Sequence, residues 1–247
     1  MLRRLLAVTL LLLTTLPAWA TTDASDRLHA MRSHGFLLVA NVLVYFNYHD
    51  SASTFSPEVR ETYRAHLAGL GRLAGEAPAT PGLGEAVQGL QEALAQLEKQ
   101  PEDAAGQYAR WINPLLRAHG ELEKAAAAAY GGTGADDSPA GRLQQQSLDL
   151  GRLLLLYETQ AFTNLGIFAV DFHEDSFREI DQRVAARHAA LLEELPDAGA
   201  TLGKVWTDYN FIRPHLLDSG KGVASRSAVR YLGKGIERLD QLALARR

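Results

Sequence analysis

The sequence of 247 residues contains no cysteine. A chain without cysteine forms no disulfide, and it offers no thiolate to a metal ion, to a c-type haem or to a nucleophilic mechanism. Its stability must therefore come from packing, and a chain of this length is long enough to bury a sizeable core.

Several motifs of enzymes and metal sites are missing as well. There is no Glu-x-x-His pair, which carboxylate-bridged di-iron bundles use, and no His-Glu-x-x-His zinc motif. No Gly-x-Ser-x-Gly elbow supports a serine hydrolase, and no glycine-rich phosphate loop follows a strand. We therefore predict a protein that is not an enzyme, with no catalytic residues and no cofactor.

An excess of positive charge is also absent. The chain has 25 Lys and Arg against 29 Asp and Glu, which gives a formal net charge of −4. Non-specific binding to nucleic acid depends on an excess of Lys and Arg. We predict that no nucleic acid is a partner.

An uncharged, mostly apolar run lies at the N-terminus. It extends from Leu5 to Leu16, after Arg3 and Arg4, and it is followed by Pro17 and by Ala18-Trp19-Ala20. Such a pattern is typical of a secretory signal peptide, and the run is too short to span a bilayer core of roughly 30 Å. The sequence predicts a signal peptide at residues 1–20, cleavage after Ala20, and a periplasmic protein that does not span the membrane.

Apolar residues recur at spacings of three and four through most of the remaining chain, as in an amphipathic helix. The clearest stripes cover residues 150–168, 177–195 and 229–242. No segment shows the alternation of a strand, and the apolar stretch Phe36–Tyr48 continues a helical pattern that begins at Arg27. We predict an all-α fold, a helical bundle resembling a four-helix bundle, within residues 21–247.

Turn and capping residues divide the bundle. Ser56 is a good N-cap, with Pro57 at the first helical position. The stretch 131–139 is rich in Gly and Asp and is the strongest linker, and Asp136, Asp137 or Ser138 is suited to cap the helix that follows.

Two segments one hundred residues apart resemble each other. Trp111–Leu116 and Phe211–Leu216 share Ile, Pro and the final Leu, and a Phe precedes a His by eleven residues twice, at Phe55 and Phe177. One interpretation is an internal duplication, with two similar halves of helical hairpins at 21–130 and 140–247. The alternative is chance similarity in a helical chain rich in Leu and Ala.

Histidines and carboxylates at five positions are the candidate metal ligands. His66 and His188 each lie on an apolar helical face, where they could face each other and bind a metal or respond to pH. Each could instead be a core histidine that is hydrogen-bonded to an acceptor. His173, Glu174 and Asp175 could hold a divalent cation, or they could favour the start of the next helix.

Four basic residues recur at intervals of four near the C-terminus: Arg226, Arg230, Lys234 and Arg238. Like charges at that spacing repel by about 0.2–0.5 kcal/mol per pair. Acidic neighbours, an anionic ligand or a partner protein would offset the repulsion, and a solvated face is the alternative. We take these four residues as candidate binding residues.

An aromatic segment that contains Trp206 and Tyr209 is a further candidate. These residues either line a small-ligand pocket or pack in the core. Residues 177–217 resemble one half of the periplasmic helical sensor domain of type IV pilus chemotaxis transducers and nitrate/nitrite sensor kinases. The resemblance rests on Phe177, on aliphatic residues at helical spacing, on Trp206 and Tyr209, and on a pair of leucines.

The resemblance implies a periplasmic four-helix bundle, a fold that is sometimes duplicated in that family. We expect an exported, soluble, non-enzymatic binding or interaction protein, a sensor-like or adaptor bundle of the cell envelope. Its partner would be a cell-envelope protein or a small ligand. The alternative is a metal- or small-ligand-binding bundle that uses histidines and carboxylates.

Overall fold

The computed structural model describes residues 18–76, 80, 82–131, 138–162, 176–221 and 224–247, and every regular element in these residues is helical. The α-helices are α2 (Ala18–Tyr45), α3 (Pro57–Glu76), α4 (Leu83–Glu98), α5 (Ala109–Gly131), α6 (Pro139–Thr159), α7 (Ser176–Glu194), α8 (Gly199–Leu217) and α9 (Ser225–Leu244). Short 3-10 helices lie at Glu102–Gln107, Pro196–Ala198 and Ser219–Lys221. The predicted all-α bundle is confirmed. No helix in the described ranges is long and apolar enough to cross a membrane.

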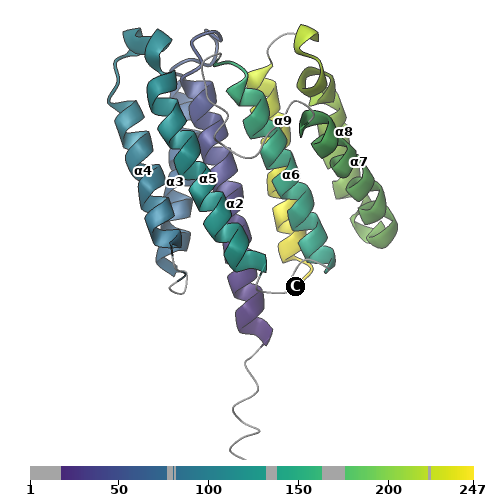
Figure 1. Ribbon diagram of the computed structural model, residues 1–247. Coiled ribbons are helices and arrows are strands. Elements are labelled where there is room, and N and C mark those ends of the chain that lie inside the picture. Colours follow the sequence, from purple (N-terminus) through teal and green to yellow (C-terminus); the bar gives the residue numbers. More distant parts are fainter. Residues whose placement is uncertain (1–17, 77–79, 81, 132–137, 163–175, 222–223) are drawn as a thin grey trace, which may run out of the picture.

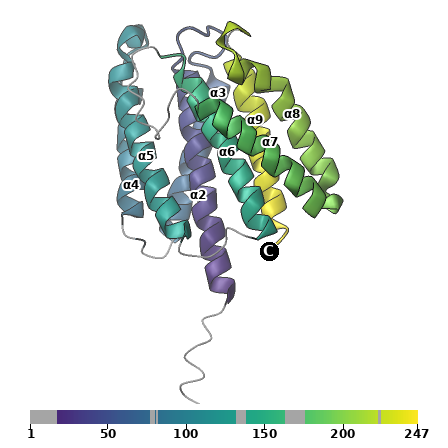
Figure 2. The same ribbon diagram turned by 45° about the vertical axis from the view of Figure 1, so that its right-hand side comes forward.

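The helices form two halves that lie side by side. Figure 1 shows α2 to α5 on one side and α6 to α9 on the other, with consecutive helices running in opposite directions. Each half has its own cluster of buried apolar side chains. The turned view in Figure 2 shows α2 and α6 between the outer helices, where they join the halves.

Helix α2 is shared by both cores. Phe36, Leu38 and Val39 belong to the cluster of the N-terminal half, whereas Leu37 and Ala40 belong to that of the C-terminal half. A helix that is apolar on all sides is typical of a fully buried position. The predicted helix through the apolar stretch is confirmed, and it ends at Tyr45.

The predicted helix starts also agree with the structure. Helix α3 begins at Pro57, directly after Ser56. Helix α6 begins at Pro139, and the side chain of Ser138 accepts a hydrogen bond of 2.9 Å from the backbone N–H of Gly141. The capping residue after the linker is therefore Ser138. The stripe predicted over 150–168 is helical only to Thr159. Residues 160–162 form a turn, and residues 163–168 lie outside the described residues.

A chain of buried and half-buried charges crosses from one half to the other. Arg32 of α2 donates to Glu123 of α5, and Arg152 of α6 donates to Glu123 over 3.1 Å and to Asp149 over 2.9 Å. Asp149 also accepts a hydrogen bond of 2.6 Å from Arg187 of α7. The arginines hold the pKa of Glu123 at about 2, although its burial opposes this shift. Arg152 thus connects α6 to Glu123 of α5.

The two similar segments fall at different places in the two halves. Trp111–Leu116 lies in α5, the fourth α-helix of its half, whereas Phe211–Leu216 lies in α8, the third of its half. His66 lies in α3 and His188 in α7, which are the second helices of the two halves. The internal duplication stays a prediction. Of the repeated features, only these two histidines lie in corresponding helices of the two halves within the described residues.

Candidate functional site

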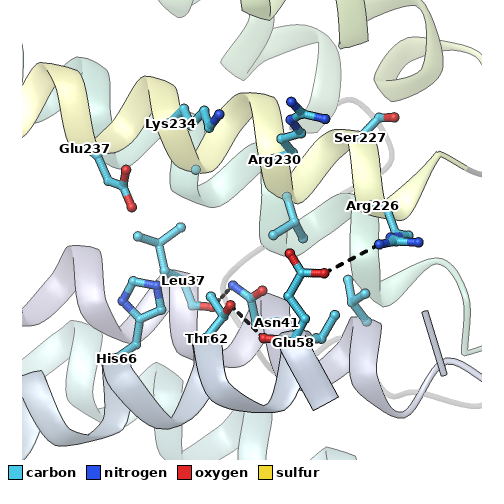
Figure 3. Close-up of a pocket in the computed structure, with 14 residues that line it drawn as sticks. Leu37, Asn41, Glu58, Thr62, His66, Arg226, Ser227, Arg230, Lys234 and Glu237 are labelled. Carbon is cyan, nitrogen blue, oxygen red and sulfur yellow. Dashed lines mark hydrogen bonds and ion pairs between the residues drawn. The ribbon is translucent and has the colours of Figure 1, made fainter. Parts of the chain in front are cut away.

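The candidate site is an open groove between α3 and α9, with α2 as its floor. Its volume is about 630 Å³. Leu37, Asn41 and Val44 of α2 lie at its base, and the side walls carry most of its polar groups. Figure 3 shows α9 along one wall and α3 along the other.

Each wall carries a ladder of residues spaced by four. The ladder on α3 is Glu58, Thr62 and His66, and the ladder on α9 is Arg226, Arg230 and Lys234. Residues four apart share one helix face, so each ladder is directed to one side of its helix. The ladder on α9 can be recognised in the sequence because basic residues recur every four positions. The ladder on α3 cannot, because its three members are of three different types.

The four basic candidates have different surroundings. Arg226 lies 3.8 Å from Glu58 across the groove, and Arg238 donates to Asp208 of α8 over 2.7 Å. The Arg230 guanidinium lies 5.9 Å from the ring of Tyr231. Within the described part of the chain, neither Arg230 nor Lys234 has a carboxylate partner. Carboxylates therefore pair with Arg226 and Arg238. The positive charges of Arg230 and Lys234 have no such partner among the described residues.

Glu237 continues the basic wall beyond Lys234. Its carboxylate makes no hydrogen bond or ion pair with any described residue, and Figure 3 shows it at the same end of the groove as His66. The groove thus has three cations and one carboxylate on α9, and Glu58 on α3 already pairs with Arg226. Its middle favours an anionic group.

His66 has a histidine partner that sequence reasoning missed. Its Nδ1 lies 3.0 Å from Nδ1 of His34 on α2. Burial lowers the pKa of His66 to about 4, with a further contribution from His34, and burial also lowers the pKa of His34. Both rings are neutral near pH 7. No local sequence signal relates these two residues, because they are 32 positions apart on different helices.

His188 lies in a different environment from His66. Its ring stacks on Trp206 of α8, with ring centroids 4.5 Å apart and an interplanar angle of 7°. No hydrogen bond or ring contact in the described residues joins His66 to His188, so the two histidines do not face each other as a pair. His188 is buried and packed on Trp206, as the core alternative has it, but it makes no hydrogen bond within the described residues.

The aromatic candidates Trp206 and Tyr209 pack inside the C-terminal half. Tyr209 is buried, and its hydroxyl donates a hydrogen bond of 2.6 Å to Asp181 of α7. Arg213 donates to the same carboxylate over 2.6 and 2.8 Å. Neither Trp206 nor Tyr209 lines the groove. Their contacts support the core-packing interpretation.

The remaining metal candidates, His173, Glu174 and Asp175, lie outside the described residues. Within the described ranges, no three His, Asp or Glu side chains are already gathered in a position to hold a metal ion.

Comparisons with protein-family models, with curated proteins and with solved structures gave no match to this chain. The groove is therefore the feature from which a function can be inferred.

Proposed function

We propose that this protein is an exported, non-enzymatic binding module of the cell envelope, and that the groove between α3 and α9 receives an acidic segment of a partner protein. The supporting observation is the middle of the basic ladder, where Arg230 and Lys234 line an open groove without a carboxylate partner among the described residues. Two cations on one face attract an anionic group and give it a fixed register.

The dimensions of the groove favour a peptide segment. Arg226 and Glu237 stand eleven positions apart on α9, which corresponds to about 16 Å along a helix. An extended peptide of about five residues covers this length. Leu37, Val59 and Val229 offer apolar contact between the polar ladders, so a segment that combines acidic and apolar side chains fits best.

Binding of a fluorescently labelled oligoglutamate peptide, measured by anisotropy, tests the proposal. We expect saturable binding that weakens as salt is added, because exposed charges are screened. The double variant Arg230→Gln/Lys234→Gln should bind about three- to tenfold more weakly, since each exposed ion pair contributes about 0.2–1 kcal/mol. The melting temperature should stay nearly unchanged.

A matched control removes two charges elsewhere. Arg110 and Arg246 lie outside the groove, and Arg110→Gln/Arg246→Gln lowers the net charge by the same amount. This control should bind the peptide like the unmodified protein. Equal weakening in both double variants would show general charge attraction instead of a site, and an unchanged affinity in the groove variant would reject the groove.

Export is the second part of the proposal, supported by the cationic and apolar N-terminal pattern of residues 1–20. N-terminal sequencing of the protein recovered from its native envelope should give Thr21 as the first residue. A protein that retains Met1 inside the cell would reject this part.

A further inference from the structure

Three arginines meet at one buried carboxylate on α6. Nη1 of Arg152 lies 2.9 Å from Oδ1 of Asp149, and Nη1 of Arg187 lies 2.6 Å from Oδ2. Nη2 of Arg183 lies 3.4 Å from Oδ1. Helix α7, which supplies two of the three arginines, packs against α6 (Figure 2). Because all three guanidinium groups contact the same carboxylate, they are held close together.

Positive charge exceeds negative charge in this cluster. Arg152 also reaches Glu123 of α5 over 3.1 Å, and Arg32 of α2 pairs with the same Glu123. Within the described ranges, no other carboxylate pairs with any of these arginines. His119 lies beside Glu123, and its buried ring is neutral near pH 7. Four guanidinium groups against two carboxylates leave two positive charges in excess.

The arginines on Asp149 reach the surface, whereas the carboxylate does not. The side chain of Asp149 is 2% exposed, and that of Arg183 is 47% exposed. The side chains of Arg152 and Arg187 are 21% and 23% exposed. Arg183 and Arg187 each bond to Asp149 through a single nitrogen, so most of their N–H groups are left for another acceptor.

The charge and the donors of this cluster favour a phosphate group. A phosphate monoester carries about −1.5 to −2 charges at pH 7 and has three strong acceptor oxygens. This charge matches the excess of the cluster, and the planar guanidinium suits the geometry of phosphate oxygens. A single carboxylate would neutralise only half of the excess.

We infer that Arg152, Arg183 and Arg187 form a binding site for a phosphate group, either free phosphate or the phosphate ester of a small molecule. The ligand binds on the solvent side of the guanidinium groups, and Asp149 holds them together from the inside. None of the three arginines lines the groove between α3 and α9. This site is therefore separate from the one proposed for an acidic peptide.

Equilibrium dialysis of the purified protein against radiolabelled inorganic phosphate, at low ionic strength, tests the inference. We expect saturable binding of one phosphate per chain. Arg183→Gln should weaken binding about fivefold and Arg187→Gln about tenfold, because each removes charge-assisted hydrogen bonds to the ligand. Asp149→Asn should strengthen binding about threefold, because it removes a negative charge beside the ligand. Arginines that serve only to hold Asp149 would bind no phosphate.

Two double variants separate this site from general charge attraction and from the groove. Arg110→Gln/Arg246→Gln removes two charges elsewhere, and Arg230→Gln/Lys234→Gln removes the central charges of the groove. Both should bind phosphate like the unmodified protein. Equal weakening in these variants and in Arg183→Gln would overturn the inference.

Competition identifies the source of the phosphate group. Displacement of the labelled phosphate by glycerol phosphate would assign the site to phosphate esters, and displacement by unlabelled inorganic phosphate alone would assign it to the free ion. Acetate should not compete, because it has one charge and two oxygens. Acetate that competes as well as phosphate would overturn the choice of a phosphate group.

Arg183→Gln is the variant that decides the outcome if Asp149→Asn or Arg187→Gln fails to fold. Arg183 is the most exposed of the three arginines and makes the longest contact, so its loss should leave urea unfolding nearly unchanged. The inference is overturned if no phosphate binds, or if folded Arg183→Gln binds as tightly as the unmodified protein. Loss of oligoglutamate binding alone would reject only the groove, and loss of phosphate binding alone would reject only this site.

Discussion

The two halves of the molecule bury polar groups in different ways. In the C-terminal half, a buried aspartate joins each pair of consecutive helices. Asp149 links α6 to Arg187, Asp181 links α7 to Arg213, and Asp208 links α8 to Arg238. Each aspartate is at least nine-tenths buried, and arginines lower the pKa of Asp149 and Asp181.

The N-terminal half contains the ion pair of Arg32 with Glu123, and it otherwise relies on aromatic rings and neutral histidines. Tyr45, Phe46 and Tyr108 belong to a group of rings in edge-to-face contact. His119 of α5 is buried against Phe36, and burial lowers its pKa to about 4. The comparison teaches that two bundles of equal helix number can be specified by different means. One has an aspartate–arginine pair between each two consecutive helices, and the other has mainly ring packing and neutral polar groups beside the pair of Arg32 with Glu123.

Removal of a buried aspartate should have the largest effect. Asp149→Ala leaves Arg152 and Arg187 without their shared carboxylate and should lower the free energy of unfolding by about 3–5 kcal/mol. In the N-terminal half, Glu98 is less buried and pairs with the exposed Arg64, so Glu98→Ala should cost about 1 kcal/mol. Urea unfolding measures both changes. Equal losses would remove the proposed difference between the halves.

The contact between the halves should give an intermediate effect. Gly151 of α6 faces Phe36 of α2, and a Cβ there would lie 3.0 Å from the ring. Gly151→Ala should therefore cost about 1–3 kcal/mol through overpacking. Gly203 of α8 is the matched control, because a Cβ there meets nothing within 4 Å. Gly203→Ala should stabilise by about 0.5–1 kcal/mol. A stabilising Gly151→Ala would show that α2 and α6 are less closely packed.

A further difference concerns pH, because two histidines of the N-terminal half and one glutamate of the C-terminal half change stability in opposite directions. His66 and His119 titrate near 6.5 in the unfolded chain but at about 4 in the native protein, so stability falls as the pH drops from about 6.5 toward 4. Burial raises the pKa of Glu158 on α6 to about 8 from an ordinary value of 4.5, so stability falls as the pH rises from about 4.5 through 8.

Urea midpoints between pH 4.5 and 8.5 test these two slopes. Stability should be greatest near neutral pH. His66→Gln should flatten the acid side only, and Glu158→Gln should flatten the alkaline side only. A variant that flattens both sides, or neither, would contradict the assignment of the acid slope to His66 and of the alkaline slope to Glu158.

Local features of the fold could be predicted from the sequence, because they depend on neighbouring residues. The helical period through Phe36–Val44 and the caps at Ser56 and Ser138 are of this kind. The pairing of His66 with His34 and of Arg238 with Asp208 could not be predicted, since each depends on how two distant helices pack. The basic ladder of α9 is a pattern in the sequence itself. The wall opposite it could not be predicted, because it depends on the position of α3 relative to α9.

The position of α2 in both cores has a consequence for how the chain could be divided. If the backbone is cut between Gly131 and Ser138, the C-terminal piece loses the apolar residues Leu37 and Ala40, which α2 contributes to its core. The N-terminal piece then exposes those same residues on one face of α2. The two pieces then carry complementary apolar surfaces. The protein is therefore suited to fragment complementation, in which separately expressed halves reassemble without a covalent link.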